Sequence, residues 1–224
     1  MLAAEIPAYF PDGFFWTKLI FSNFFLVEDR LKFSKHGPYH RCILDDQQHH
    51  ITIPCHFGKH DSICSVSIDN TSNWSRKHWN TIRMVMGQFP YSDYLLPELE
   101  PLFEYSNSHL SQFLFRIIRY LKYIWRLDTK IMLMSESFTC QLPKLYVNEW
   151  QLLTNENSIL IFPDELKFLN PHVKKQSVIW RTIRFNNPTF EEELKHNGLY
   201  LLLKYGTDLP GLIKKETEII EEQL

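Results

Sequence analysis

Glycine is scarce in this sequence, with 7 residues in 224. Glycine-rich loops hold phosphate groups in P-loop and dinucleotide-binding proteins, and neither of these motifs occurs here. The Gly-x-Ser-x-Gly motif of many serine hydrolases is also missing. These absences argue against three common kinds of enzyme.

Long apolar runs and blocks of basic residues are missing as well. No apolar run approaches the roughly 18 residues that a membrane-spanning helix needs. The N-terminus carries Glu5 and no early lysine or arginine, unlike a signal peptide. The net charge is −2 and the basic residues are dispersed, so no nucleic-acid partner is expected. The four cysteines require no disulfide framework in a chain of this length. Together these absences predict a cytoplasmic protein without a transmembrane segment.

Apolar and aromatic residues, by contrast, are plentiful. They make up 44% and 15% of the chain, which predicts a folded protein with a sizeable core. No linker, repeat or low-complexity segment divides the sequence. We therefore expect a single α/β domain over residues 1–206, followed by an acidic amphipathic helix over residues 207–224.

Hydrophobic periodicity predicts a mixed fold with a partly parallel sheet and a central helical segment. The chain opens as strand, helix and strand over residues 5–10, 14–21 and 24–27. Three central helices follow, over 73–89, 97–105 and 108–127, and the last has a continuous apolar stripe. Thr189 and Glu192 form a capping box for a helix that ends near Gly206. Further strands are predicted over 39–44, 50–54, 63–68, 130–134, 158–162 and 177–185.

Polar residues follow the first strands of this predicted sheet. Tyr9 comes after the first strand, Glu28 after the second, and Tyr39 and Arg41 follow shortly afterwards. Ligands of parallel sheets bind at the carboxyl ends of the strands. The segments that contain Tyr9 and Glu28 are both expected to lie at this end of the sheet. Arg41 can pair with a carboxylate or phosphate of a substrate, or alternatively form an ion pair with Glu28 or Asp29.

A second candidate group lies on the first central helix. Trp74, His78 and Thr81 are three or four residues apart and share one face, with Lys77 beside Thr81. A histidine can act as general base while a lysine holds an anion. The alternative is structural, with Trp74 packed in the core and His78 making a hydrogen bond.

The segment from His36 to Cys64 is rich in histidine and cysteine. A zinc site would use Cys55, His56, His60 and Cys64, whereas the alternative is a hairpin with polar side chains in water. The paired Cys-x-x-Cys ligands of structural zinc sites are absent, so no metal and no cofactor is predicted. A catalytic cysteine is a less favoured interpretation than a buried apolar one.

The order of residues in the first half of the chain resembles the WbqC-like protein family. The resemblance covers about residues 3–137. Its first part consists of Ala8-Tyr9-Phe10-Pro11, Phe15, Lys18-Leu19, Val27-Glu28, Lys35, Tyr39-His40-Arg41-Cys42 and Ile51-Thr52-Ile53-Pro54. Its second part consists of Trp74, Lys77-His78-Trp79, Thr81-Ile82, Pro90-Tyr91, Tyr94, Leu99 and Pro101-Leu102-Phe103. His40 replaces the asparagine of the family's Asn-Arg pair, and the C-terminal half matches poorly.

The resemblance implies a role in bacterial O-antigen or other surface-polysaccharide biosynthesis, as a transferase of glycine or another aminoacyl group to a sugar. Sugar nucleotides or activated amino acids are then the expected small-molecule substrates. The alternative is a non-catalytic binding or scaffold protein of a polysaccharide-assembly complex. A nucleotidyl-transferase-like Rossmann variant ranks last, because the sequence has no His-x-Gly-His element.

Eight residues that match the family pattern are the predicted site. His78 and Glu28 are the expected catalytic bases. The expected substrate-binding residues are Tyr9, Lys35, Tyr39, Arg41, Trp74 and Lys77. Acyl transfer to an amine needs a base for the ammonium proton and donors for the oxyanion, and these residue types supply both.

Overall fold

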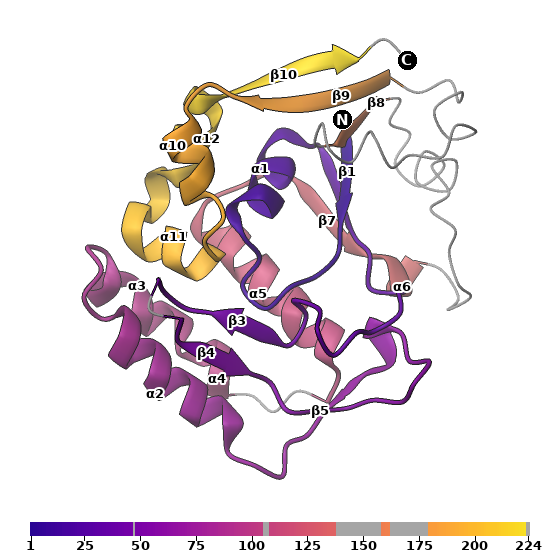
Figure 1. Cartoon of the computed structure of the whole chain (residues 1–224), viewed down its shortest axis with the longest axis vertical. Coiled ribbons are helices and arrows are strands. Elements are labelled where there is room, and N and C mark those ends of the chain that lie inside the picture. The colour runs from indigo at the N-terminus through magenta and orange to yellow at the C-terminus, as the bar shows by residue number, and fades with distance from the viewer. Residues whose placement is uncertain (47, 105–107, 138–157, 162–178, 223–224) are drawn as a thin grey trace.

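The computed structural model describes residues 1–46, 48–104, 108–137, 158–161 and 179–222 (Figure 1). Its main feature is a sheet with the strand order β10-β9-β8-β1-β2-β7. All neighbouring strands run parallel except β10 and β9, which are antiparallel. The strands are β1 (Leu2–Glu5), β2 (Phe24–Val27), β7 (Lys130–Leu133), β8 (Ser158–Ile161), β9 (Ile179–Phe185) and β10 (Thr217–Glu222). The fold is therefore α/β with a mostly parallel sheet, as predicted.

Helix α1 (Gly13–Phe21) connects β1 to β2 and packs against both strands. It begins at the N-cap residue Asp12, whose side chain accepts a hydrogen bond from the backbone of Phe15. Nearly all of its side chains are buried, including Lys18, whose ammonium lies 2.8 Å from the Glu5 carboxylate. This ion pair, buried on the lysine side, connects α1 to the end of β1.

The central segment supplies helices and two small hairpins. The hairpins consist of β3 (Arg41–Ile43) with β4 (His50–Thr52) and β5 (Cys55–His56) with β6 (Ser67–Ile68). The helices are α2 (Trp74–Met86), α3 (Ser92–Leu99), α4 (Pro101–Glu104), α5 (Leu110–Ile124) and the short α6 (Met134–Ser137). Helix α5 carries the predicted apolar stripe, and all of its buried apolar side chains belong to the core.

The C-terminal segment returns to the same core. It contains α10 (Pro188–Glu193), α11 (Gly198–Tyr205), the 3-10 turn η2 (Gly206–Asp208) and α12 (Leu209–Glu216). Helices α11 and α12 contact α1, and Trp16 of α1 packs edge-on against Trp125 after α5 at 4.6 Å between ring centroids. Buried residues from the N-terminal, central and C-terminal parts form one cluster, which agrees with a single domain.

Two predicted strands differ in the structure. The first strand is β1 (Leu2–Glu5) and not residues 5–10, because Pro7 has no N–H to donate and Phe10 has a left-handed φ of 55°. Residues 63–65 form a 3-10 turn, η1 (Ile63–Ser65). The N–H groups of Ile63 and Cys64 bond to Leu31 and Asp29, so only Ser67–Ile68 pairs as a strand.

The predicted C-terminal helices also differ. The capping box at Thr189 is wrong, because Asn187 caps α10 and Asn197 caps a separate helix, α11. The helix predicted over 207–224 ends at Glu216, where the chain turns into β10 and pairs with β9. The division of the chain at residue 206 stays a prediction. The ends of several predicted elements, residues 105, 162, 177–178 and 223–224, lie outside the described residues.

Candidate functional site

A cleft of about 920 Å³ lies at the carboxyl end of β1. Its lining includes the segment between β1 and α1, the loop over residues 36–38, the β3–β4 hairpin, and Lys195 and Asn197 from the C-terminal part. Parallel α/β sheets bind their ligands at the carboxyl ends of the strands, so this position is the one expected for a substrate.

The β3–β4 hairpin turns one face of its side chains toward the cleft. Arg41 is paired with Thr52 in the ladder, and Ile43 is paired with His50. These four residues are exposed and line the cleft, whereas Cys42 and Ile51 between them are buried in the core. The alternation of a β-strand therefore places a guanidinium and an imidazole on the same wall.

Asp12 provides a carboxylate at the N-terminus of α1. Its side chain is exposed within the cleft while it caps the helix. Desolvation by the surrounding protein raises the pKa of this carboxyl, and the Glu5 carboxylate adds to the rise, against the N–H bonds from Phe15 and Phe14 that lower it. An accessible carboxylate with a raised pKa is suited to accept a proton from a substrate.

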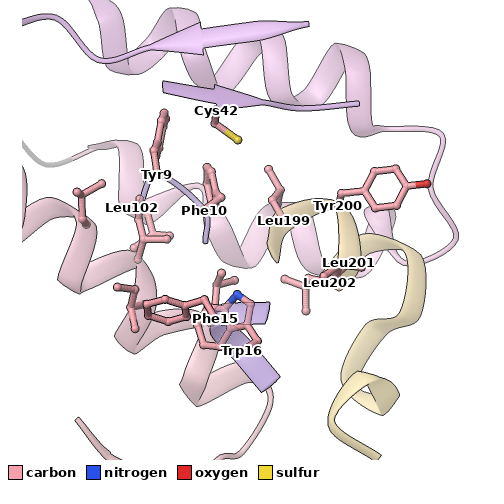
Figure 2. Close-up of a cluster of buried hydrophobic side chains, with 14 of the residues drawn as sticks. Tyr9, Phe10, Phe15, Trp16, Cys42, Leu102, Leu199, Tyr200, Leu201 and Leu202 are labelled. Atoms are coloured by element: carbon pink, nitrogen blue, oxygen red, sulfur yellow. The ribbon is translucent and has the colours of Figure 1, made fainter. Parts of the chain in front are cut away.

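The floor of the cleft is aromatic. Tyr9, Phe10 and Phe15 line it and belong to the buried cluster shown in Figure 2, together with Cys42 and Leu199. The rings of Tyr9 and Phe10 stack at 5.0 Å between centroids. Phe10 has a left-handed φ although it is buried, and strained backbone of this kind clusters at functional sites.

The C-terminal segment completes the cleft. Asn197 donates from its amide to the carbonyl of Ile43 at 2.6 Å and forms an isolated bridge with Asp12. Gly198 donates its N–H to Pro11 at 2.7 Å. These bonds hold the start of α11 against both β3 and the segment that follows β1.

Two of the eight predicted site residues, Tyr9 and Arg41, line this cleft. Arg41 is exposed and forms no ion pair with any residue in the described ranges. Tyr9 is buried, and its hydroxyl lies 3.0 Å from Nδ1 of His78. The structure therefore brings Tyr9 and His78 together, although they are far apart in the sequence.

His78 does not line the cleft, because it is buried behind Tyr9. Burial lowers its pKa to about 4, against a hydrogen bond with the backbone of Thr52 that raises it. The imidazole is thus neutral near pH 7. When the N–H of one ring nitrogen donates a hydrogen bond to the backbone of Thr52, the other nitrogen, Nδ1, accepts one from the Tyr9 hydroxyl.

Trp74 belongs to the same buried group. Its ring lies edge-on to His78 at 5.2 Å and to Phe113 at 5.4 Å, and its indole N–H donates to Asn70 at 3.1 Å. This packing agrees with the alternative given for Trp74 in the sequence analysis, in which the tryptophan belongs to the core and does not bind a substrate. Lys77, on the same helix, is exposed and lies outside the lining of the cleft.

Glu28 is held in a buried ion pair. Both of its oxygens accept from the guanidinium of Arg30, at 2.9 and 2.8 Å, and both side chains are 5% exposed. Its partner is therefore Arg30 and not Arg41. Lys35 is exposed, and Tyr39 is buried against Phe33 with a pKa that burial raises. None of these three predicted residues lines the cleft.

Three of the four residues considered for a zinc site have other partners. The Cys55 thiol contacts the carbonyl of Ile53, the Cys64 thiol contacts the hydroxyl of Ser62, and His56 lies 3.7 Å from Asp69. Burial raises the pKa of the Cys55 thiol to about 12, which disfavours the thiolate that zinc requires. In the described part of the chain, no group of three or more metal-ligating side chains converges.

Sequence reasoning missed Glu5, Asp12, His50, Lys195 and Asn197, which line the cleft. A signal existed for Asp12, since the turn Pro11-Asp12-Gly13 follows a strand and precedes a helix, where aspartate is a favoured N-cap. No local signal existed for His50 or for the C-terminal residues, because only the hairpin register and long-range packing bring them to the cleft.

Comparison with known proteins identifies the family. The model of the WbqC-like protein family matches residues 7–156, which include Tyr9, Asp12, Arg41, His50 and His78. Lys195 and Asn197 lie beyond the matched residues. No curated protein and no solved structure matches this sequence. No helix among the described residues is both long and apolar enough to cross a bilayer. On the strength of a match over more than half of its length, the chain belongs to the WbqC-like protein family.

Proposed function

We propose that this protein is a transferase of surface-polysaccharide biosynthesis that joins an activated amino acid to the amino group of a sugar. The observation that carries the proposal is the cleft at the carboxyl end of β1, where an accessible carboxylate, Asp12, and the guanidinium of Arg41, which has no ion pair among the described residues, line the same hollow. The aromatic floor offers a flat apolar surface for a sugar or base.

In the proposed reaction the amine nitrogen attacks the acyl carbonyl, and a C–N bond forms as the bond to the leaving group breaks. Asp12 accepts the proton that the nitrogen loses. Arg41 holds the anionic part of the donor or the developing oxyanion. We assign the base to Asp12 because His78 and Glu28, the predicted bases, are buried in pairs outside the lining.

His78 then acts through Tyr9 as a positioning residue. The bond between them fixes the phenol ring that forms part of the cleft floor. The catalytic roles of His78 and Glu28, and the binding roles of Lys35, Tyr39, Trp74 and Lys77, stay predictions.

The test is product formation from amino-sugar nucleotides and aminoacyl donors, followed by mass spectrometry. Asp12→Asn keeps the helix cap, since asparagine also accepts the Phe15 N–H, but it cannot take a proton. We expect turnover to fall about 100- to 10,000-fold. Asp93→Asn, an exposed carboxylate in the first turn of α3, is the matched control and should leave turnover unchanged.

The alternative function is a non-catalytic scaffold protein, and the burial of both predicted bases favours it. Measurements of ligand binding distinguish the transferase from the scaffold. A ligand at about 100 times its Kd adds about 2.7 kcal/mol and raises the Tm by about 5–10 °C in a chain of this size. We expect this shift for a substrate, and a Kd raised about 10- to 100-fold in Arg41→Ala. No shift with any sugar nucleotide or aminoacyl donor, in a correctly folded protein, would favour the scaffold.

A further inference from the structure

Basic side chains from three separate elements gather at the edge of the sheet opposite the cleft. Two adjoining hollows of about 430 and 650 Å³ lie where β2 and β7 begin, and they share the residues from Arg126 to Lys130. Five basic residues and one acidic residue, Asp128, line them. The basic residues are Arg119 and Lys122 on α5, Arg126 after α5, Lys130 at the start of β7, and Lys214 on α12. We call these five residues the basic edge.

The basic edge is not neutralised by neighbouring acids. Arg119, Arg126, Lys130 and Lys214 are exposed and Lys122 is half-buried. None of the five side chains forms an ion pair with a residue of the described ranges, and the ammonium of Lys130 lies over the ring of Phe24, at 5.2 Å. In a chain with a net charge of −2, this is a local excess of positive charge.

Arg126 adds an independent observation. Its φ is 52°, one of three positive values among the non-glycine residues that the structure describes. It follows the C-cap of α5, and Arg126 and Leu127 donate their N–H groups to Tyr123 and Lys122, the pattern of a helix end that usually contains glycine. Arginine is strained in this conformation, and Arg126 lines both hollows.

Stabilisation of the helix explains only part of the cluster. Cations in or just after the last turn of α5, here Lys122 and Arg126, interact favourably with the helix dipole. Arg119 lies more than one turn before the end, and Lys130 and Lys214 belong to other elements. A helix dipole acting within one turn does not account for these three residues.

We propose that the basic edge docks the protein on an anionic lipid surface, where the side chains contact phosphate groups of several headgroups. Long flexible side chains reach a plane of anions better than a single enclosed phosphate, which is normally held by the N–H groups of a helix N-terminus. Here the helix end at the hollows is the C-terminal one. Tyr123, 77% exposed beside Lys122, is the amphipathic aromatic residue typical of the headgroup region.

Nucleic acid fits this surface less well. Single-stranded nucleic acid is usually bound by several aromatic stacking platforms along a basic groove, and Tyr123 is the single strongly exposed aromatic side chain in the lining. Docking is independent of the proposed transferase activity, because none of the five basic residues lines the cleft at β1.

The test is flotation of the full chain with vesicles of phosphatidylcholine, with or without phosphatidylglycerol. We expect binding to the anionic vesicles alone, weakened by salt. Arg126→Gly should reduce the affinity about fivefold, and Arg119→Ala/Lys122→Ala/Arg126→Gly about a hundredfold. Arg76→Ala, an exposed arginine on α2, should bind like the native protein.

Thermal unfolding of each variant shows whether a loss of vesicle binding is caused by misfolding. Glycine suits a φ of 52°, so Arg126→Gly should retain or raise the Tm while it loses affinity. Equal binding of neutral and anionic vesicles, or unchanged binding by the triple variant, would overturn the proposal. Tighter binding of a single-stranded oligonucleotide than of anionic vesicles would also overturn it. The same holds if pyrophosphate raises the Tm in a way that depends on Arg126 while the protein does not bind vesicles.

Discussion

The hydroxyl of Tyr9 lies 3.0 Å from Nδ1 of His78, and both side chains are buried. This bond joins the segment after β1, which lines the cleft, to helix α2, which does not. We therefore expect a change at His78 to alter the position of the Tyr9 ring in the cleft floor.

Stability should decrease in acid because of His78. The pKa of histidine is about 6.5 in the unfolded chain and about 4 in this protein. Between these pH values the unfolded chain binds a proton that the folded protein does not, so the free energy of unfolding falls as the pH decreases from 6.5 to 4. The loss approaches about 3 kcal/mol and does not grow below that range.

Urea titrations at several pH values measure this loss, and His78→Gln is the control. Glutamine can accept from Tyr9 and donate to Thr52 but does not titrate. Burial raises the pKa of Asp29, so this carboxyl makes the protein more stable as the pH falls. That effect is the same in the native protein and in His78→Gln. The difference between native protein and variant thus isolates His78; a difference that does not vary with pH would contradict the prediction.

Tyr9→Phe should destabilise the protein by about 1–3 kcal/mol, because Nδ1 of His78 is left buried without its partner. Tyr94→Phe is the matched control: Tyr94 is 78% exposed, and its change should stay within about 0.5 kcal/mol. Both are measured as midpoints of urea unfolding. Equal effects of the two substitutions would show that the buried bond contributes nothing.

Arg30→Met should be strongly destabilising. It leaves the Glu28 carboxylate buried without its bidentate partner, at a cost of about 3–5 kcal/mol. The double variant Glu28→Gln/Arg30→Met removes both charges and should recover most of this loss. Lys195→Ala breaks the exposed pair with Glu192 and should cost at most about 1 kcal/mol. A single variant as stable as the double one would contradict the interpretation.

Two glycines should respond oppositely to alanine. A Cβ at Gly198 would lie 2.4 Å from Nε1 of Trp16 and 2.8 Å from the Pro11 carbonyl, so Gly198→Ala should cost about 1–3 kcal/mol. A Cβ at Gly211, within α12, would meet nothing within 4 Å, and Gly211→Ala should add about 0.5–1 kcal/mol. Thermal unfolding compares them, and a rise in Tm for Gly198→Ala would show that α11 is not packed tightly there.

The sequence was sufficient for features that depend on local pattern. The apolar stripe of α5 and the strand Phe24–Val27 follow from side-chain spacing, because an amphipathic element buries the same face wherever it packs. The ordered residues of the first half of the chain were also enough to indicate the family.

Only the tertiary structure decided which candidates share a site. It placed Arg41 on the same face of the β3–β4 hairpin as the unpredicted His50, buried His78 behind Tyr9, and closed the cleft with Asn197. It also gathered the basic edge from residues that are dispersed in the chain. Periodicity reports the environment of a residue within its own element, whereas these contacts depend on pairing and packing between elements far apart in the sequence.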